Sequence, residues 1–199
     1  MYSYYGGGCL DKYNEIEIKY KILINKAIDI VNDITDYEHN INHTLDVVDF
    51  TKELLDKLNI DVDKDVCIIA AYWHDTGRIK LDKGHEKLSA DMLKDEMLKY
   101  EYDITFIDKC YKAIINHKWN MIPETNEGLI IKDADKLAFL GKRRWIECLK
   151  HNYRLDSIIS LLPKLKDEIL YFSESKKIYD RLTIELVNLL YKEVCNGNN

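Results

Sequence analysis

Six residues of this 199-residue chain are candidate ligands for divalent metal ions. They are His43, His74, Asp75, His85, His117 and Asp135. Imidazole nitrogens combined with carboxylate oxygens suit borderline or hard ions such as Mn²⁺, Fe²⁺, Zn²⁺, Co²⁺ or Mg²⁺. Each residue lies at the end of a predicted helix or beside an apolar segment, so several helices can bring the six together. The pattern therefore predicts a metal site where helices converge.

His74 and Asp75 directly follow eight apolar residues, at positions 66–73. A run this short without a polar face predicts a helix buried on all sides and not a membrane span. Gly77 comes next, and we expect it to end the helix in the left-handed conformation that glycine accepts. Burying two titratable groups is costly unless something binds them, which favours a metal ion. An adjacent His-Asp pair taken alone is only weak evidence of a metal site.

The elements that would position these residues are helices. Long segments rich in Ile, Leu, Lys and Glu have helical spacing, and the chain has only two prolines, so an all-α fold is predicted. We expect a leader over 1–14, ordered only near its end, and one multi-helix domain over 15–199. Asp63 is a candidate cap for the buried helix. Further helices are predicted over 15–34, 41–58, 85–100, 104–117, about 129–140, 155–170 and 174–195, with a loop over 76–84.

Charge and cysteine usage limit the function classes. The net charge is −6 and the two signs are interspersed, which argues against an extended nucleic-acid surface. Five scattered cysteines without a CxxC pair fit reduced thiols, and the first ten residues lack the features of a signal peptide. We therefore expect a cytoplasmic protein that does not bind membranes. The pattern leaves open whether the last two helices form a homodimer interface.

Three segments together resemble the HD-domain superfamily of metal-dependent phosphohydrolases. They read HNINHTLDVV, CIIAAYWHDTG and IKDADKLAFLG, and the resemblance covers about residues 20–145. It implies a helical bundle around a central metal, with His43, His74, Asp75 and Asp135 as the ligands. Asp135 is preferred to Asp133 because a basic residue and then Leu follow it; Asp133 stays an alternative with a supporting or capping role.

Two further histidines match additional histidines of several HD subfamilies. His85 stands in GHEKLSAD and His117 in AIINHK. In dinuclear members such residues bind a second metal, with Asp75 here as the bridge; in mononuclear members they lie beside the substrate phosphate. The resemblance thus implies one divalent ion per chain, or two. It also implies catalytic roles: Asp75 orients or deprotonates water, and His85 or His117 protonates the leaving oxygen or holds phosphate.

Other polar and aromatic residues have two readings each. Arg78 and Lys136 are candidates for binding substrate phosphate, or are solvated charges. His39 is interpreted as a supporting or surface residue and His151 as a surface residue. The remaining candidates are Trp73 and Trp119, read as core or as a stacking surface for a nucleobase, and Lys142, Arg143 and Arg144, read as a solvated helix start or as partners of an acidic residue.

The function implied by the resemblance is hydrolysis of a phosphate ester or phosphoanhydride, as a phosphomonoesterase, phosphodiesterase or pyrophosphatase. A nucleotide or related small phosphate compound is the first substrate class. The Gly-Tyr-Pro segment of cyclic-di-nucleotide phosphodiesterases and the Glu-Asp pair of alarmone hydrolases are absent, which disfavours those branches. Two alternatives remain: a diiron oxygenase-like enzyme using the same six ligands, and a non-catalytic sensor that binds a nucleotide.

Overall fold

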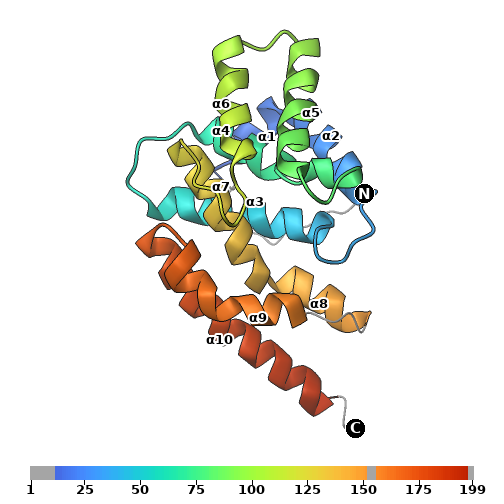
Figure 1. The fold of residues 1–199 in the computed structure, drawn as a ribbon, viewed down its shortest axis with the longest axis vertical. Coiled ribbons are helices and arrows are strands. Elements are labelled where there is room, and N and C mark those ends of the chain that lie inside the picture. Colours follow the sequence, from blue (N-terminus) through green and yellow to red (C-terminus); the bar gives the residue numbers. More distant parts are fainter. Residues whose placement is uncertain (1–11, 152–155, 197–199) are drawn as a thin grey trace.

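The protein is a single all-α domain (Figure 1). The computed structural model describes residues 12–151 and 156–196. All secondary-structure elements assigned within these ranges are helices. Helices α5 and α6 form a hairpin at one end of the molecule, and α8, α9 and α10 lie at the other (Figure 1). Four of the metal-binding candidates come from the layer between them, where α3, α4 and α7 pack together, and the other two come from the α5–α6 hairpin. The predicted leader falls mostly outside the described residues.

The predicted helix over 15–34 is divided into two. Helix α1 spans Asn14–Lys19 and α2 spans Lys21–Asn32, with Tyr20 between them in a non-helical conformation. The side chain of Tyr20 is buried, and its hydroxyl donates to Asp65 at 2.8 Å. The apolar spacing correctly identified the buried side of α2, but it extends across Tyr20 and so could not show this interruption.

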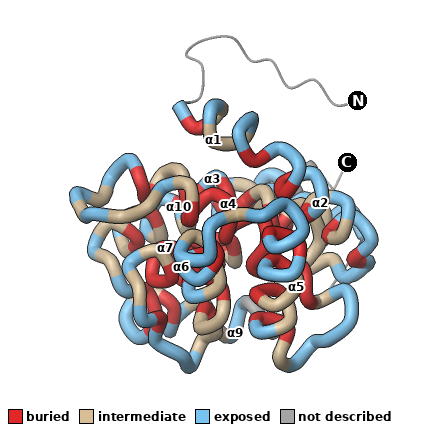
Figure 2. Tube along the Cα trace, turned by 90° about the horizontal axis from the view of Figure 1, so that it is seen from above, coloured by how far each residue is buried: buried red, intermediate tan, exposed pale blue. Residues whose placement is uncertain are grey.

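Helix α4, Lys64–Trp73, is the buried helix that the sequence predicts. Its residues from Val66 onward are buried, and it contacts α2, α3, α6 and α7. Figure 2 shows the buried segments concentrated in the interior of the bundle. The side chain of Asp63 accepts a hydrogen bond from the Val66 backbone at 3.4 Å, which confirms the predicted cap. Helix α3, Ile41–Lys57, crosses beside α4 and is capped by Asn40.

The expectation for Gly77 is wrong. Helix α4 ends four residues earlier, and Gly77 lies in the 3₁₀ turn η1, Thr76–Ile79, without a positive φ. Glycine is required there for a different reason. A Cβ atom at this position would lie 2.3 Å from the carbonyl oxygen of His85 and 2.8 Å from the Ser89 nitrogen. The glycine therefore lets η1 pack directly on the next helix. Among the described glycines, the left-handed conformation is found at Gly84, with φ +86°.

The remaining helices complete the bundle. Helix α5 spans His85–Lys99 and α6 spans Ile104–Ile115. They are followed by α7, Asn126–Leu137, the short turn η2, Ala138–Leu140, and α8, Lys142–Lys150. Thr125 caps α7 by accepting from the Gly128 backbone at 3.1 Å. No helix in the described part of the chain combines the length and the apolar character that crossing a bilayer requires.

The C-terminal region covers one side of α7. Helix α9, Asp156–Lys164, leads into the π-helical turn η3, Leu165–Ile169, and α10, Ser173–Asn196, which contacts α7, η2 and α3. One face of α10 is buried, whereas Ile184, Val187 and Tyr191 are 65%, 60% and 71% exposed. Homodimer formation through this region stays a prediction.

Candidate metal centre

Five elements of the fold deliver the six candidate ligands to one buried region. His43 lies in the first turn of α3, and His74 and Asp75 directly follow α4. His85 is the first residue of α5, His117 lies two residues after α6, and Asp135 is in the last turn of α7. All six side chains are buried. The sequence alone proposed these six residues, and the structure brings them together.

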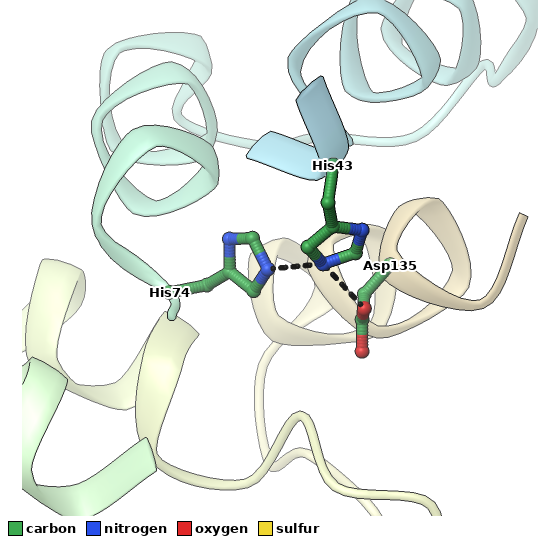
Figure 3. A group of neighbouring side chains, drawn as sticks. All are labelled: His43, His74 and Asp135. Atoms are coloured by element: carbon green, nitrogen blue, oxygen red, sulfur yellow. Dashed lines mark hydrogen bonds and ion pairs between the residues drawn. The ribbon is translucent and has the colours of Figure 1, made fainter. Parts of the chain in front are cut away.

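Three of the six form a group that we call the first triad: His43, His74 and Asp135. The Nε2 atom of His43 lies 3.2 Å from Nε2 of His74 and 3.3 Å from Oδ1 of Asp135 (Figure 3). All three offer a ligand atom within 4.8 Å of the other two. Two imidazoles and a carboxylate that converge from three helices have the donor chemistry of a divalent-ion site.

Asp75, His85 and His117 form the second triad, whose ligand atoms also lie within 4.8 Å of one another. Oδ1 of Asp75 is 3.1 Å from Nε2 of His85 and 3.6 Å from Nε2 of His117. The other carboxylate oxygen, Oδ2, is 3.5 Å from Nε2 of His43 and 3.7 Å from Nε2 of His74. Asp75 therefore stands between the two triads with one oxygen toward each.

Backbone carbonyls fix the orientation of three of the four histidines. Nδ1 of His74 donates to Ala71 at 2.8 Å, Nδ1 of His85 to Asp82 at 2.6 Å, and Nδ1 of His117 to Ile114 at 2.7 Å. Because a carbonyl only accepts, the proton of each neutral ring is on Nδ1. The Nε2 lone pair of each then faces the site, as metal ligation requires.

Arg144 holds the fourth histidine, and sequence reasoning missed this role. Its side chain is 0% exposed, and Nη2 donates to Nδ1 of His43 at 2.7 Å and to the carbonyl of Glu38. The prediction that Arg144 belongs to a solvated helix start is therefore wrong. The acidic-partner reading fits its neighbour Arg143, which donates to Asp46 at 2.6 Å. The available signal was helical spacing, because Arg144 shares a buried face of α8 with Cys148.

Burial and local charge set the protonation of the centre. Burial lowers the pKa of His74 to about 3, so its ring is neutral near pH 7. Burial alone would raise the pKa of Asp75, but the positive charge of Arg78 and the contacts with the site histidines outweigh it and hold that pKa well below 3.8. Lys136 and His43 act on Asp135 in the same way. Charged carboxylates beside a neutral imidazole are the protonation states that metal ligation needs.

The two predicted phosphate-binding cations each contact a carboxylate of the centre. Nε of Arg78 donates to Oδ2 of Asp75 at 2.8 Å, and Nη1 donates to Asp82 at 3.2 Å. Nζ of Lys136 donates to Oδ2 of Asp135. Both cations are thus positioned beside the site, and their contact with a substrate stays a prediction.

Asp133 does not join the centre. Its carboxylate accepts from the backbone nitrogen of Tyr171 at 2.9 Å and from that of Phe172 at 2.9 Å, just before α10 begins. This is the capping alternative that the sequence left open. His39 bonds to Asp36, and its ring stands edge-on to that of His43, with centroids 5.8 Å apart.

The remaining aromatic and histidine candidates differ in burial and lie in the core, partly buried or at the surface. Trp73 is buried, and its indole nitrogen donates to the Leu23 carbonyl at 3.1 Å, so it belongs to the core. Trp119 is half-buried, 6.5 Å from the ring of Phe139. His151 is an exposed residue that contacts Glu147, as expected for a surface position.

The donor set fits a divalent ion on grounds beyond residue type. Within the described part of the chain, Oδ1 of Asp75 is buried without a hydrogen bond. Two Nε2 lone pairs, those of His85 and His117, lie beside this oxygen. A buried carboxylate oxygen without a partner is costly, and a cation bound there would remove that cost.

Comparison with known families agrees with this arrangement. The family model described as the HD domain matches residues 40–140. The chain belongs to the HD-domain family. The match includes all six candidate ligands and ends before Arg144, so the HD model alone does not indicate the residue that holds His43.

A solved HD structure shares the fold. It is the crystal structure of a predicted HD superfamily hydrolase from an uncultured Thermotogales bacterium, with a TM-score of 0.68 and 20% sequence identity. The alignment covers 89% of this chain and 92% of that chain. A comparison with curated proteins gives no match. The HD fold therefore extends over most of the chain, including helices beyond the matched family model.

Proposed function

We propose that this HD-domain protein is a metal-dependent hydrolase of phosphate ester or phosphoanhydride bonds. The observation that carries the proposal is the position of Asp75, whose two oxygens face two separate buried triads. The first triad would hold one divalent ion and the second triad another, with Asp75 between them. Ions held in this way activate water and neutralise the charge of phosphoryl oxygens.

The chain's own residues supply orientation and proton transfer. Asp75 is placed to orient water or accept its proton, because one of its oxygens faces each triad. In the alternative with a single ion at the first triad, His85 and His117, which are fixed by carbonyl bonds, would hold phosphate or protonate the leaving oxygen. Arg78 and Lys136 are the cations nearest to the site carboxylates and would offset the negative charge of the substrate.

A nucleotide or related small phosphate is the substrate class that we propose. The half-buried Trp119 lies beside Phe139, and Nζ of Lys136 is 5.5 Å from the Phe139 ring. Lys136 also contacts Asp135, so its side chain lies between the Phe139 ring and the metal-binding candidates. A nucleobase can stack on these aromatic rings while its phosphate reaches the centre.

Hydrolysis measurements on metal-loaded protein test the proposal. Phosphate release from nucleoside mono-, di- and triphosphates should require a divalent ion and should be lost in His74→Ala and Asp75→Ala. His151→Ala is the matched control, because this exposed histidine contacts Glu147 and the ring of Tyr37 and not the centre. If the two site variants stay folded and keep full metal-dependent hydrolysis, the proposal is wrong.

A second candidate function is oxidative. A carboxylate placed between two histidine-containing triads also suits a diiron centre that activates dioxygen. Protein grown with iron should then show an optical band that changes when dioxygen is admitted. Absence of that change in iron-loaded protein, together with hydrolysis by the manganese form, separates the two candidates.

A further inference from the structure

We propose that Arg144 makes the two triads unequal, so that a divalent cation binds the second triad more tightly than the first. The inference rests on the proposed metal-dependent function and deepens it, because it states which half of the centre is loaded first. It follows from hydrogen-bond directions, from the positions of fixed positive charges, and from a buried oxygen without a partner.

The direction of one hydrogen bond opposes metal binding at the first triad. A guanidinium only donates, so Nδ1 of His43 is the acceptor in its 2.7 Å contact with Arg144. The neutral ring of His43 then carries its hydrogen on Nε2, the atom that faces His74 and Asp135. A metal needs the lone pair of that nitrogen. His43 must therefore lose or rearrange its contact with Arg144 to become a ligand.

Positive charge also gathers at the first triad. Arg144 contacts His43, Lys136 contacts Oδ2 of Asp135, and Arg78 contacts the oxygen of Asp75 that faces this triad. Like charges repel strongly in a poorly hydrated interior, so these three cations weaken the binding of a fourth. Arg78 also occupies a lone pair of Oδ2 of Asp75, the oxygen that faces the first triad.

The second triad has the opposite arrangement. His85 and His117 donate from Nδ1 to carbonyls, which leaves both Nε2 atoms as acceptors. Oδ1 of Asp75 and Oε2 of Glu86 are buried without hydrogen bonds in the described part of the chain. Oε2 of Glu86 lies 3.7 Å from Nδ1 of His85, and the other oxygen of Glu86 is paired with Lys118. The second triad therefore offers three prepared ligand atoms, one of them a carboxylate oxygen without a hydrogen bond to any described residue, and this favours a cation there.

A contribution to stability does not explain why the guanidinium of Arg144 is buried. Among the residues that the structure describes, its Nε and Nη1 atoms have no hydrogen-bond partner, and the Phe139 ring lies 5.1 Å from Cζ. Burying a guanidinium whose donors are unpaired is costly, and an apolar side chain of similar volume is often as stable or more stable. Replacement by methionine should therefore preserve the fold, which separates the effect of Arg144 on the metal from a structural effect.

Calorimetric titration of metal-free protein with Mn²⁺ tests the inference. Wild type should show two binding events of unequal affinity. Arg144→Met should tighten the weaker event at least tenfold and leave the tighter one unchanged, whereas Arg144→Lys, which keeps the charge, should resemble wild type. Arg143→Met is the matched control, since this neighbour contacts Asp46 and Asp49 and not the centre. If Arg144→Met is unstable, Arg144→Gln removes the charge and can still donate to Glu38.

Ligand variants assign the two events. His117→Ala should remove the tighter event and His43→Ala the weaker one. The inference is overturned if the two events have equal affinity, if loss of the Arg144 charge leaves the weaker event unchanged or weakens it, or if His43→Ala removes the tighter event. A wild-type protein that binds no Mn²⁺ contradicts the proposed function itself, and so the two failures are distinguishable.

Discussion

Replacing Asp133 by alanine is expected to destabilise the protein by about 2–3 kcal/mol while leaving metal binding intact. The carboxylate accepts three hydrogen bonds from the backbone nitrogens of Tyr171 and Phe172, at 2.9–3.1 Å. It thereby fixes the start of α10 against α7. The expectation separates Asp133 from Asp135, two residues further along the same helix.

The magnitude follows from burial and exposure together. A buried bond to a charged acceptor contributes about 1.5–3 kcal/mol, which for two donors would give a larger loss. Tyr171 is 61% exposed, however, so water can replace part of what is lost there. Loss of a helix cap costs about 0.5–2 kcal/mol, and the expected value lies between these two scales.

Urea unfolding and Mn²⁺ titration of Asp133→Ala and Asp135→Ala form the assay. Asp133→Ala should lower the free energy of unfolding and keep the affinity for Mn²⁺. Asp135→Ala should weaken Mn²⁺ binding at the first triad, with a smaller effect on unfolding. The reasoning is refuted if Asp133→Ala unfolds like wild type, or if it loses metal as Asp135→Ala does.

Three further expectations follow from the same contacts. Gly77→Ala should destabilise by about 1–3 kcal/mol in urea unfolding, because its Cβ would overlap the carbonyl of His85. It should also weaken metal binding, because the overlap is with the backbone of the candidate ligand His85; unchanged metal affinity in Gly77→Ala would contradict this. Asp63→Ala should cost about 1 kcal/mol by removing the cap of α4, and unchanged unfolding would show that the cap contributes nothing. Mn²⁺ at about 100 times its Kd should stabilise by about 2.7 kcal/mol and raise the Tm, with reversal by EDTA; a Tm insensitive to Mn²⁺ would argue against a metal site.

The sequence was sufficient for the features that depend on local pattern. The apolar run before His74 predicts a buried helix, and Asp63 predicts its cap, because both signals lie within one segment. The six candidate ligands could be named because they stand in segments that resemble the HD-domain superfamily, near predicted helix ends. The HD family and the all-α fold follow from the same segments.

Features that depend on distant partners could not be predicted. Asp133 and Asp135 lie two residues apart on α7 and so point in very different directions, about 200° apart, and only the position of α10 decides which faces the centre. Arg144 contacts His43 across 101 residues of sequence, and a run of three basic residues reads as a solvated surface. The role of Gly77 depends on the close approach of α5 to η1, which no local pattern contains.

Metal content per chain, measured by mass spectrometry on wild-type protein and on Asp75→Asn, tests the central claim most directly. The substitution keeps the size of the side chain between the triads and removes its charge. The account predicts that wild-type protein saturates with divalent ions at both triads and that Asp75→Asn retains far less metal under the same conditions. Wild-type protein that takes up no divalent ion, or Asp75→Asn protein that binds as much as wild type, would contradict the account.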